Sequence, residues 1–176
     1  LEKKVNLKKE ISVIVTRFQN KVISIYEPIE NVHENQILKR SKIPADINNG
    51  IQLECLESAK KIAEHLGYVG SMCVEFFIDK NDNVLVNEIA PRVHNSGHLT
   101  INSHNICQFE GHIRAVCNLD LVSPSKISNA EMINILGKEI EDYRKKSFND
   151  GEFFFDYEKK LIKDKRKMGH LTILKK

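Results

Sequence analysis

Two glutamates occupy positions at which a β-hairpin would bring their side chains together. Glu75 lies in a strand-like run over residues 71–79, Glu88 lies in a second run over residues 84–90, and a turn-forming cluster over residues 80–83 separates the runs. A loop of two or four residues pairs Asp79 with Val84, and the same register sets Glu75 opposite Glu88 with β-carbons about 5 Å apart. A loop of three or five residues would break this pairing.

Because opposed carboxylates repel each other, the glutamate pair predicts a cation between them. Apolar neighbours would limit the water that screens the two charges, namely Val74, Phe76, Phe77, Val86 and Ile89. Hard oxygen ligands suit Mg²⁺ bound together with substrate phosphates, and Asn87 adds a carbonyl oxygen nearby. The alternative is an exposed sheet face that carries ordinary solvated acids.

The second strand runs into a loop that is dense in hydrogen-bonding side chains, residues 91–98. Arg92 offers a planar fork of donors for a carboxylate, bicarbonate or phosphate. His94, Asn95 and His98 could donate, accept or transfer protons. The four-residue spacing of His94 and His98 would suit zinc on a helix, but the Asn-Ser-Gly sequence between them disfavours a helix there. The loop therefore predicts an anion site beside the metal.

A cluster of cations near the end of the chain could hold a phosphate. It comprises Lys159, Lys160, Lys163, Lys165, Arg166 and Lys167. The alternative is a solvated cationic loop, which is the commoner role of a charge run. No aromatic residues interleave with these cations, so a stacking surface for single-stranded nucleic acid is not indicated.

The elements that must position these residues can be read from apolar spacing. Residues 11–17 and 21–27 predict a hairpin, and residues 48–66 predict an amphipathic helix that ends at Gly67. A second helix is expected at about residues 105–117, with Ile106, Phe109, Ile113 and Val116 on one face. Short strands are expected at residues 132–136, 152–157 and 167–174, which together predict a small β-rich unit.

The composition is that of a globular protein. The 176 residues are 41% hydrophobic and carry a net charge of +3, which is too small to indicate a nucleic-acid partner by bulk charge. The apolar runs are far shorter than the roughly 20 residues of a membrane span. The four cysteines show no paired spacing and predict reduced thiols in a cytoplasmic protein. The chain begins at Leu1, which suggests a fragment of a longer protein.

Taken together, these residues resemble the 5-(carboxyamino)imidazole ribonucleotide synthase family of ATP-grasp ligases. The stretches that carry the resemblance follow the family's order along nearly the whole chain, at residues 10–17, 30–33, 66–70, 74–77, 87–98, 108–110, 112–116 and 166–170. An acidic residue on one strand with Asn-Glu on the next is common to ATP-grasp enzymes. The run Ala-Pro-Arg-Val-His-Asn-Ser-Gly-His at residues 90–98 is specific to this branch.

The resemblance implies an α+β fold, namely the carboxy-terminal half of an ATP-grasp fold, an antiparallel sheet with packed helices, followed by a small β-rich carboxy-terminal subdomain. The expected division is an ATP-grasp part over residues 1–120 and the small domain over residues 121–176. The family's amino-terminal half is missing from the chain, so the fragment alone is expected to be inactive. Residues 161–165 also depart from the family by lacking a Pro-Gly turn.

The activity implied by the resemblance is ATP-dependent phosphorylation of bicarbonate, followed by carboxylation of the 5-amino group of aminoimidazole ribonucleotide in purine biosynthesis. Glu75 and Glu88, with Asn87 beside them, would hold Mg²⁺, or Mn²⁺ in its place, on the ATP phosphates. Catalytic roles at the bicarbonate site fall to Arg92, His94 and Asn95. Residues implied to contact the nucleotide are Glu2, Lys3, Lys4, Val5, Glu10, His33, Asn87 and Glu88. Lys159 and Arg166 would clamp the ribonucleotide phosphate.

The implied partners are ATP, bicarbonate and aminoimidazole ribonucleotide, with no nucleic acid and no membrane, and the full-length enzyme is expected to be a homodimer. One alternative is another ATP-grasp carboxylase or formyl-transfer ligase that acts on a different acceptor. The other alternative is a noncatalytic module that binds an anionic partner through its basic tail.

Overall fold

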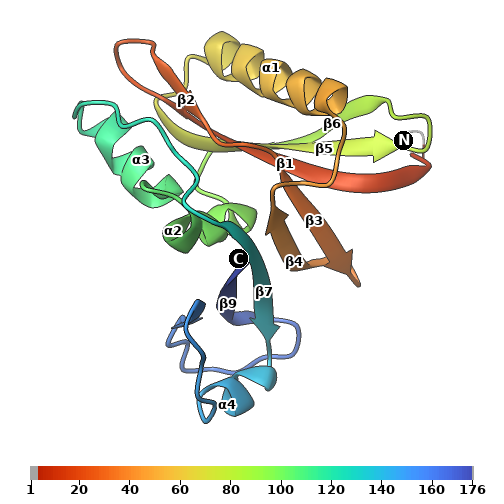
Figure 1. Cartoon of the computed structure of the whole chain (residues 1–176), viewed down its shortest axis with the longest axis vertical. Helices are drawn as coiled ribbons and strands as arrows, with labels where there is room; N and C mark the ends of the chain where they lie inside the picture. Colours follow the sequence, from red (N-terminus) through yellow and green to blue (C-terminus); the bar gives the residue numbers. More distant parts are fainter. Residues whose placement is uncertain (1–3, 176) are drawn as a thin grey trace.

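A computed structural model describes residues 4–175, and an antiparallel sheet of nine strands forms its centre (Figure 1). The strand order is β6-β5-β1-β3-β4-β7-β9-β8, and the short strand β2 pairs with β1. The strands are β1 (Leu7–Arg17), β2 (Ile23–Ile25), β3 (Ile29–Glu34), β4 (Ile37–Ile43), β5 (Gly70–Asp79), β6 (Val84–Ala90), β7 (Asn129–Leu136), β8 (Glu152–Asp156) and β9 (Lys167–Lys175). Helices pack on this sheet, which confirms the predicted α+β class.

The predicted first hairpin and first helix are both present. Val15 pairs with Ile25, and Arg17 pairs with Ile23, although β1 begins earlier than expected, at Leu7. Helix α1 (Asn49–Leu66) begins after Asn48, whose side chain accepts a hydrogen bond from the Ile51 backbone N–H. It ends at Gly67, which adopts the left-handed conformation that glycine tolerates best. Strands β3 and β4 were not predicted.

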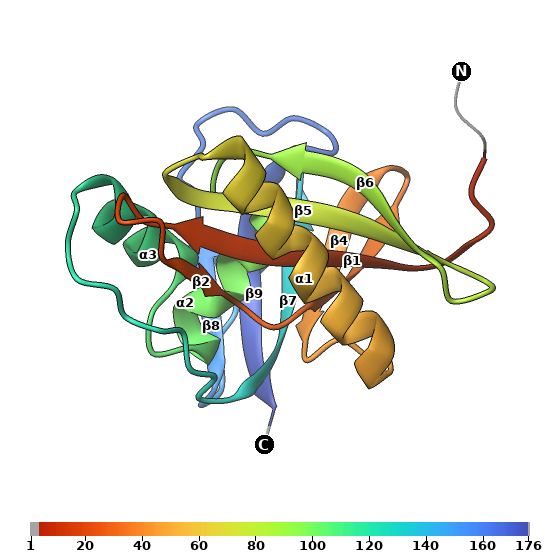
Figure 2. The ribbon, with the colours of Figure 1, turned by 90° about the horizontal axis from the view of Figure 1, so that it is seen from above.

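Helix α1 covers one face of the strands β1 and β5 (Figure 2). Its buried residues Cys55, Ala59 and Ala63 pack with alternate residues of β1 and β5. The strand residues in this cluster are Ile11, Val13, Val15, Met72, Val74, Phe76 and Ile78. Because side chains alternate along a strand, residues such as Ser12, Cys73 and Glu75 face the opposite side.

The opposite side is covered by 3₁₀ helix η1 (Asn95–Leu99) and by the helices α2 (Thr100–Ser103) and α3 (Gln108–Val116). The helix expected at residues 105–117 is shorter than predicted. Of the four residues expected on its apolar face, Ile106 is buried but precedes the helix, whereas Phe109, Ile113 and Val116 are exposed. The buried residues of the helix are Gln108, Gly111 and Ala115. The small side chains of Gly111 and Ala115 explain this orientation, because they allow α3 to approach Thr16 on β1 closely.

The hairpin of β5 and β6 brings Glu75 opposite Glu88, but not through the register that the sequence predicted. Ile78, and not Asp79, pairs with Val84, so five residues connect the last paired positions. A β-bulge at Asn87 then shifts the register by one residue and restores the pairing of Glu75 with Glu88. The bulge sends Val84 toward the α1 side, where it packs on the core, while Ala90 joins the opposite cluster.

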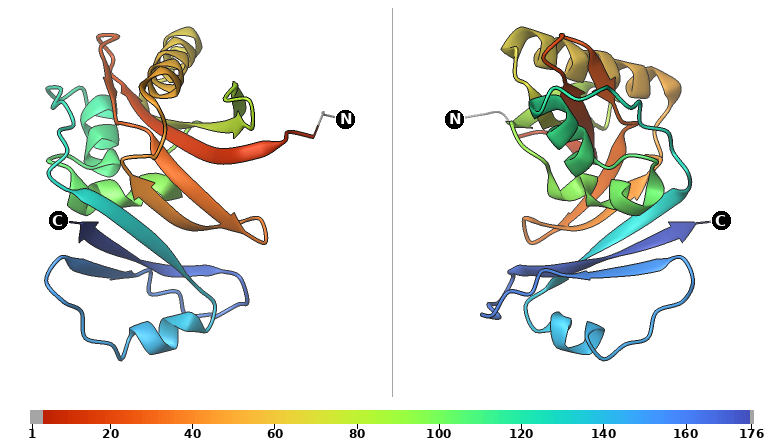
Figure 3. Two further views of the ribbon diagram at one scale, coloured as in Figure 1. Left: turned by 45° about the vertical axis from the view of Figure 1, so that its right-hand side comes forward. Right: turned by 90° about the vertical axis from the view of Figure 1, so that its left-hand side faces the viewer.

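The sheet continues into the carboxy-terminal part through the pairing of β4 with β7 (Figure 3). Strand β9 lies between β7 and β8, and the short helix α4 (Glu139–Tyr143) covers this end with Ile140 buried. One sheet spans both parts of the chain, and the division predicted at residue 120 stays a prediction. Within residues 4–175, no helix is both long and apolar enough to cross a membrane.

Candidate functional site

Glu75 and His94 form the centre of the candidate site. Glu75 projects from the face of β5 that is not covered by α1, and His94 lies in the loop that follows β6. His94 Nε2 is 3.1 Å from Glu75 Oε1, and both side chains are largely buried, at 12% and 16% exposed. The hydrogen bond from His94 is the main reason why the pKa of Glu75 lies below its usual value, and Asn87 contributes in the same direction. Glu75 is therefore an ionised carboxylate.

Gln108, at the start of α3, holds the loop that carries His94. Its amide oxygen accepts from the His94 backbone N–H at 2.9 Å, and its amide nitrogen donates to the His94 carbonyl at 2.7 Å. The same nitrogen donates to Nδ1 of His98 at 3.0 Å, so His98 is a neutral acceptor. Burial lowers the pKa of His98 to about 3, which agrees with this assignment.

The close fit of Gln108 explains the glycine in this loop. A β-carbon at Gly97 would lie 2.6 Å from the amide oxygen of Gln108. Thr100 links the same parts, because its hydroxyl donates to the Gly97 carbonyl and accepts from the Gln108 backbone N–H. The loop is thus rigidly placed against the amino end of α3.

Asn95 is oriented by the carboxy-terminal part of the chain. Asn134 on β7 donates to the Leu38 carbonyl at 3.0 Å, which identifies the amide nitrogen of Asn134, and this nitrogen also donates to Asn95 Oδ1 at 2.5 Å. The Asn95 amide nitrogen is left to donate elsewhere. Asn95 also contacts Tyr157, whose pKa is raised to about 12 by burial.

A cavity of about 380 Å³ opens beside Glu75 and His94. Its lining comes from β3, β4, β5, the His94 loop and the cationic loop before β9, and consists of His33, Gln36, Ile37, Leu38, Glu75, His94, Lys165 and Lys167. Lys167 is close enough to Glu75 for the carboxylate to raise its pKa, although burial has the larger effect and lowers it. Basic and acidic groups therefore share one pocket.

The two cations predicted to clamp a phosphate do not line this cavity. Lys159 Nζ donates to the Lys167 carbonyl at 2.6 Å, and Arg166 Nη1 donates to the Leu161 carbonyl at 3.0 Å. Both bonds join residues within the segment 159–167. The neighbouring residues Lys165 and Lys167 face the pocket instead.

Glu10 and His33, which were predicted to contact the nucleotide, contact each other. His33 Nδ1 lies 2.6 Å from Glu10 Oε2, and both side chains are about three-quarters buried. This hydrogen bond outweighs the effect of burial and raises the pKa of His33. His33 reaches the cavity of Glu75 and His94.

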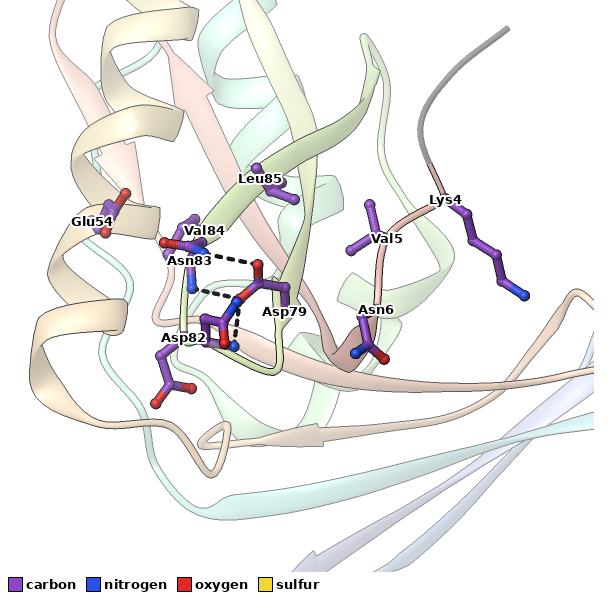
Figure 4. A pocket seen from close by; sticks show the side chains of 10 residues that line it. Lys4, Val5, Asn6, Glu54, Asp79, Asp82, Asn83, Val84 and Leu85 are labelled. Carbon is purple, nitrogen blue, oxygen red and sulfur yellow. Dashed lines mark hydrogen bonds between the residues drawn. The ribbon is translucent and has the colours of Figure 1, made fainter.

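Lys4 and Val5 lie elsewhere, beside the turn between β5 and β6 (Figure 4). They line a pocket of about 740 Å³ together with Glu54 of α1 and residues of the turn. Asp79 accepts hydrogen bonds from the Asn81 and Asn83 backbones and from the Asn83 side chain, so it fixes the turn. Glu2 and Lys3 lie outside the described residues.

The side chains near Glu75 include one soft ligand, the Cys73 thiol, and several oxygen donors that suit Mg²⁺ better. Among residues 4–175, Cys73, Glu75 and His94 form the group of at least three His, Cys, Asp or Glu residues whose ligand atoms lie within 4.8 Å of one another. Burial raises the pKa of the Cys73 thiol, so this soft ligand stays protonated. Glu88 and Asn87 lie on the exposed edge strand β6 and offer hard oxygen ligands next to Glu75. Val86 and Ile89 are also exposed, so the predicted apolar surroundings are wrong on the β6 side.

Two protein families match the chain. The phosphoribosylaminoimidazole carboxylase C-terminal domain matches residues 130–176. The ATP-grasp domain matches residues 1–109, which is more than half of the 176 residues. The chain belongs to the ATP-grasp family. The resemblance of the sequence to this family is therefore confirmed.

Curated relatives carry a common name. An N5-carboxyaminoimidazole ribonucleotide synthase of Bacillus subtilis is 42% identical to this ATP-grasp chain over 177 residues, which are 99% of this chain and 46% of the relative. A Staphylococcus aureus relative of the same name is 42% identical, with 98% and 46% covered. The chain spans about half the length of the curated relatives it matches.

Solved structures of the same group share the fold. The ADP complex of an N5-carboxyaminoimidazole ribonucleotide synthetase is similar with a TM-score of 0.95 and 39% identity, and the match covers 99% of this chain and 46% of that one. The Aspergillus clavatus synthase in complex with ADP and 5-aminoimidazole ribonucleotide has a TM-score of 0.91 and 30% identity, with 99% and 48% covered. The predicted ATP-grasp fold is thus confirmed.

Sequence reasoning missed several residues that organise the site. Gln108 and Asn134 act through side-chain amides on the backbone or on another amide, and no spacing rule identifies such contacts. Lys165 and Lys167 were part of the cationic cluster, but only the fold distinguishes the cations that face the pocket. The alternation of side chains along β9 does not predict that Lys167 faces the pocket, because Lys167 is the first residue of that strand.

Proposed function

We propose that this chain supplies half of the active site of an ATP-dependent ligase that carboxylates the 5-amino group of aminoimidazole ribonucleotide in purine biosynthesis. The observation that carries the proposal is 42% identity, over nearly the whole chain, to synthases that are named for this product. Because the chain spans 46% of those relatives, the activity belongs to the intact protein. We place that protein in the cytoplasm and expect it to be a homodimer.

Glu75 and Glu88 are the proposed ligands of Mg²⁺, with Asn87 beside them, and Mn²⁺ could replace the ion. Their direct pairing across β5 and β6 supports this role, as does the ionised state of Glu75. The metal, when bound, would neutralise the charge of the ATP phosphate oxygens. Relatives have been solved in complex with ATP or ADP, which supports nucleotide binding by the intact protein.

Arg92, His94 and Asn95 are proposed to bind bicarbonate and its phosphorylated form. Two findings support this assignment, namely the position of His94 at the wall of the cavity and the place of Asn95 directly after it in the same loop. Lys165 and Lys167 add positive charge on the other side of the same cavity. Such donors stabilise an oxyanion when they are fixed before the substrate arrives. The loop that carries His94 is fixed by Gln108.

The remaining contacts concern the two nucleotides. Lys159 and Arg166 are proposed to hold the phosphate of aminoimidazole ribonucleotide, and both donate to neighbouring backbone carbonyls, which a phosphate could replace. Glu10 is proposed to accept from the ATP ribose hydroxyls, with His33 beside it. Glu2, Lys3, Lys4 and Val5 are proposed to line the rest of the ATP pocket.

The test is phosphate release by the intact protein. We expect ATP hydrolysis to depend on bicarbonate, and product formation to require aminoimidazole ribonucleotide as well. Replacing Arg92 with Ala should lower product formation, while Arg114→Ala, which removes a cation bonded to Glu110 on α3, is the matched control. Stimulation by formate, or by another acceptor in place of aminoimidazole ribonucleotide, would instead indicate a different ATP-grasp ligase. If the intact protein bound an anionic partner in a salt-dependent manner and had no affinity for nucleotides, the proposal of an ATP-dependent ligase would be refuted.

A further inference from the structure

Four buried polar side chains form a hydrogen-bonded line from β4 to the loop of His94, and we name this line the serine chain. Ser41 Oγ donates to Asn31 Oδ1 at 2.8 Å, and Asn31 Nδ2 donates to Ser12 Oγ at 2.9 Å. Ser12 Oγ then donates to Ser96 Oγ at 2.7 Å. The three serines are 0% exposed and Asn31 is 5% exposed. The serine chain ends 2.8 Å from His94 Nδ1.

The strand register explains how the serine chain crosses the sheet. Ser41 on β4 pairs with Asn31 on β3, so their side chains share one face. Ser12 on β1 pairs with Glu75 on β5. Ser12 therefore lies on the same face of the sheet as the proposed metal ligand, directly beneath the loop of η1.

The direction of each hydrogen bond determines which nitrogen of His94 carries the proton. Ser12 accepts from Asn31, so the single hydroxyl hydrogen of Ser12 is available for Ser96. Ser96 accepts this hydrogen and can give its own to His94 Nδ1. The Ser96 backbone N–H, which can only donate, also faces Nδ1, at 3.4 Å. Because Nδ1 accepts from these donors, the proton of the neutral ring lies on Nε2.

We propose that Ser12 and Ser96 are positioning residues that keep the Nε2–H of His94 directed at the carboxylate of Glu75, the proposed Mg²⁺ ligand. This inference rests on the proposed function, since Glu75 is assigned to the metal only there. The other tautomer would direct a lone pair at the carboxylate and would repel it. In the structure, His94 Nε2 lies 3.1 Å from Glu75 Oε1, which is the hydrogen bond that the Nε2–H tautomer makes.

The cost of burying the serine chain supports a role beyond stability. Each buried hydroxyl is satisfied only while its neighbours keep the same direction, so losing one link leaves polar groups unpaired. An apolar set of side chains could fill the same space without this requirement.

Nitrogen NMR of the intact protein labelled with ¹⁵N-histidine tests the tautomer directly, and His94→Asn identifies the signal of His94. We expect wild-type Nδ1 to be unprotonated and Nε2 to be protonated. Ser96→Ala should move the two signals toward a mixture of tautomers, and Ser12→Ala should do so to a smaller extent. Ser12→Thr, which retains the hydroxyl, should restore the wild-type signals. Ser103→Ala is the control, because Ser103 is also fully buried and donates to a carbonyl, that of Leu99.

The kinetic arm separates positioning from simple loss of structure. We expect Ser96→Ala to lower kcat about tenfold, as expected for loss of a residue that orients a ligand, while the KM for ATP stays within about twofold of wild type. A wild-type His94 protonated on Nδ1, or Ser96→Ala signals identical to wild type, would overturn the inference whatever the variants do to activity. If the tautomers follow the expected order but the intact protein does not use bicarbonate, the proposed function fails and the orientation of His94 stands.

Discussion

Glu75 and Glu88 are paired across the β5–β6 hairpin because a bulge at Asn87 compensates for a turn of odd length. In strict alternation, Val84, Val86, Glu88 and Ala90 would all share one face of β6. The bulge divides them, so that Val84 packs toward α1 while Glu88 faces the same side as Glu75. One inserted residue thus allows a single strand to serve the core near the turn and the candidate site farther along.

The pairing predicts unequal effects of removing the two carboxylates. Glu88→Gln should weaken the apparent Mg²⁺ affinity in ATP turnover by about tenfold, which corresponds to about 1.4 kcal/mol. Glu75→Gln should have a larger effect, because it also removes the partner of His94. Titration of Mg²⁺ against the ATPase rate of the intact protein measures both. Glu57→Gln on the exposed side of α1 is the matched control. Unchanged kinetics of Glu88→Gln at limiting Mg²⁺ would remove Glu88 from the site.

The relation of Glu75 to Glu88 could be predicted from the sequence, but the path that produces it could not. A two-residue period predicts which face a side chain occupies only if no residue is inserted, and nothing in the residues 84–90 distinguishes a bulge from a regular strand. Helix α1 was predictable because both ends carry specific signals, Asn48 and Gly67. The buried face of helix α3 was predicted wrongly, because the small buried residues Gly111 and Ala115 carry little apolar signal compared with the exposed Ile113.

Two glycines predict opposite responses to the same substitution. Gly97→Ala places a β-carbon 2.6 Å from the Gln108 amide oxygen, so we expect the free energy of unfolding to fall by about 1–3 kcal/mol. Gly111→Ala on α3 meets its nearest atom, Thr16 Oγ1, at 3.4 Å, and alanine favours a helix by about 0.5–1 kcal/mol over glycine. Urea unfolding of both variants measures the difference. Equal effects of the two substitutions would show that Gln108 does not constrain the loop.

The ion pair of His33 and Glu10 predicts a stability that declines as the pH rises. The pKa of His33 is raised in the folded state, chiefly by its hydrogen bond with Glu10. Its contribution is therefore complete below the unfolded pKa of about 6.5 and is lost as the pH rises through the folded pKa. We expect a coupling of about 1 kcal/mol between His33→Gln and Glu10→Gln at pH 6 and a smaller one at pH 9. Urea unfolding of the four proteins at both pH values gives the coupling, and a coupling independent of pH would contradict the assignment.

His104 predicts the opposite slope. It is 6% exposed, lies edge-on to Tyr26 at 5.2 Å, and its pKa falls from 6.5 to about 4, mainly because burial disfavours the charged ring. Ser103 donates to the Leu99 carbonyl, so its oxygen accepts from His104 Nδ1–H. The neutral ring of His104 is therefore hydrogen-bonded in the folded chain.

The unfolded chain takes up a proton on His104 near pH 6.5, and the folded chain does so only near pH 4. The stabilisation by the neutral ring is therefore complete above pH 6.5 and is lost between these values as the pH falls. The loss is about 3 kcal/mol at most. His104→Asn retains a donor at the position of Nδ1 but does not titrate in this range. Urea unfolding from pH 8 to pH 4 should therefore show a smaller fall in the free energy of unfolding for the variant than for the wild type. If the free energies of the two proteins fell in parallel with pH, His104 would not be the cause of the acid sensitivity.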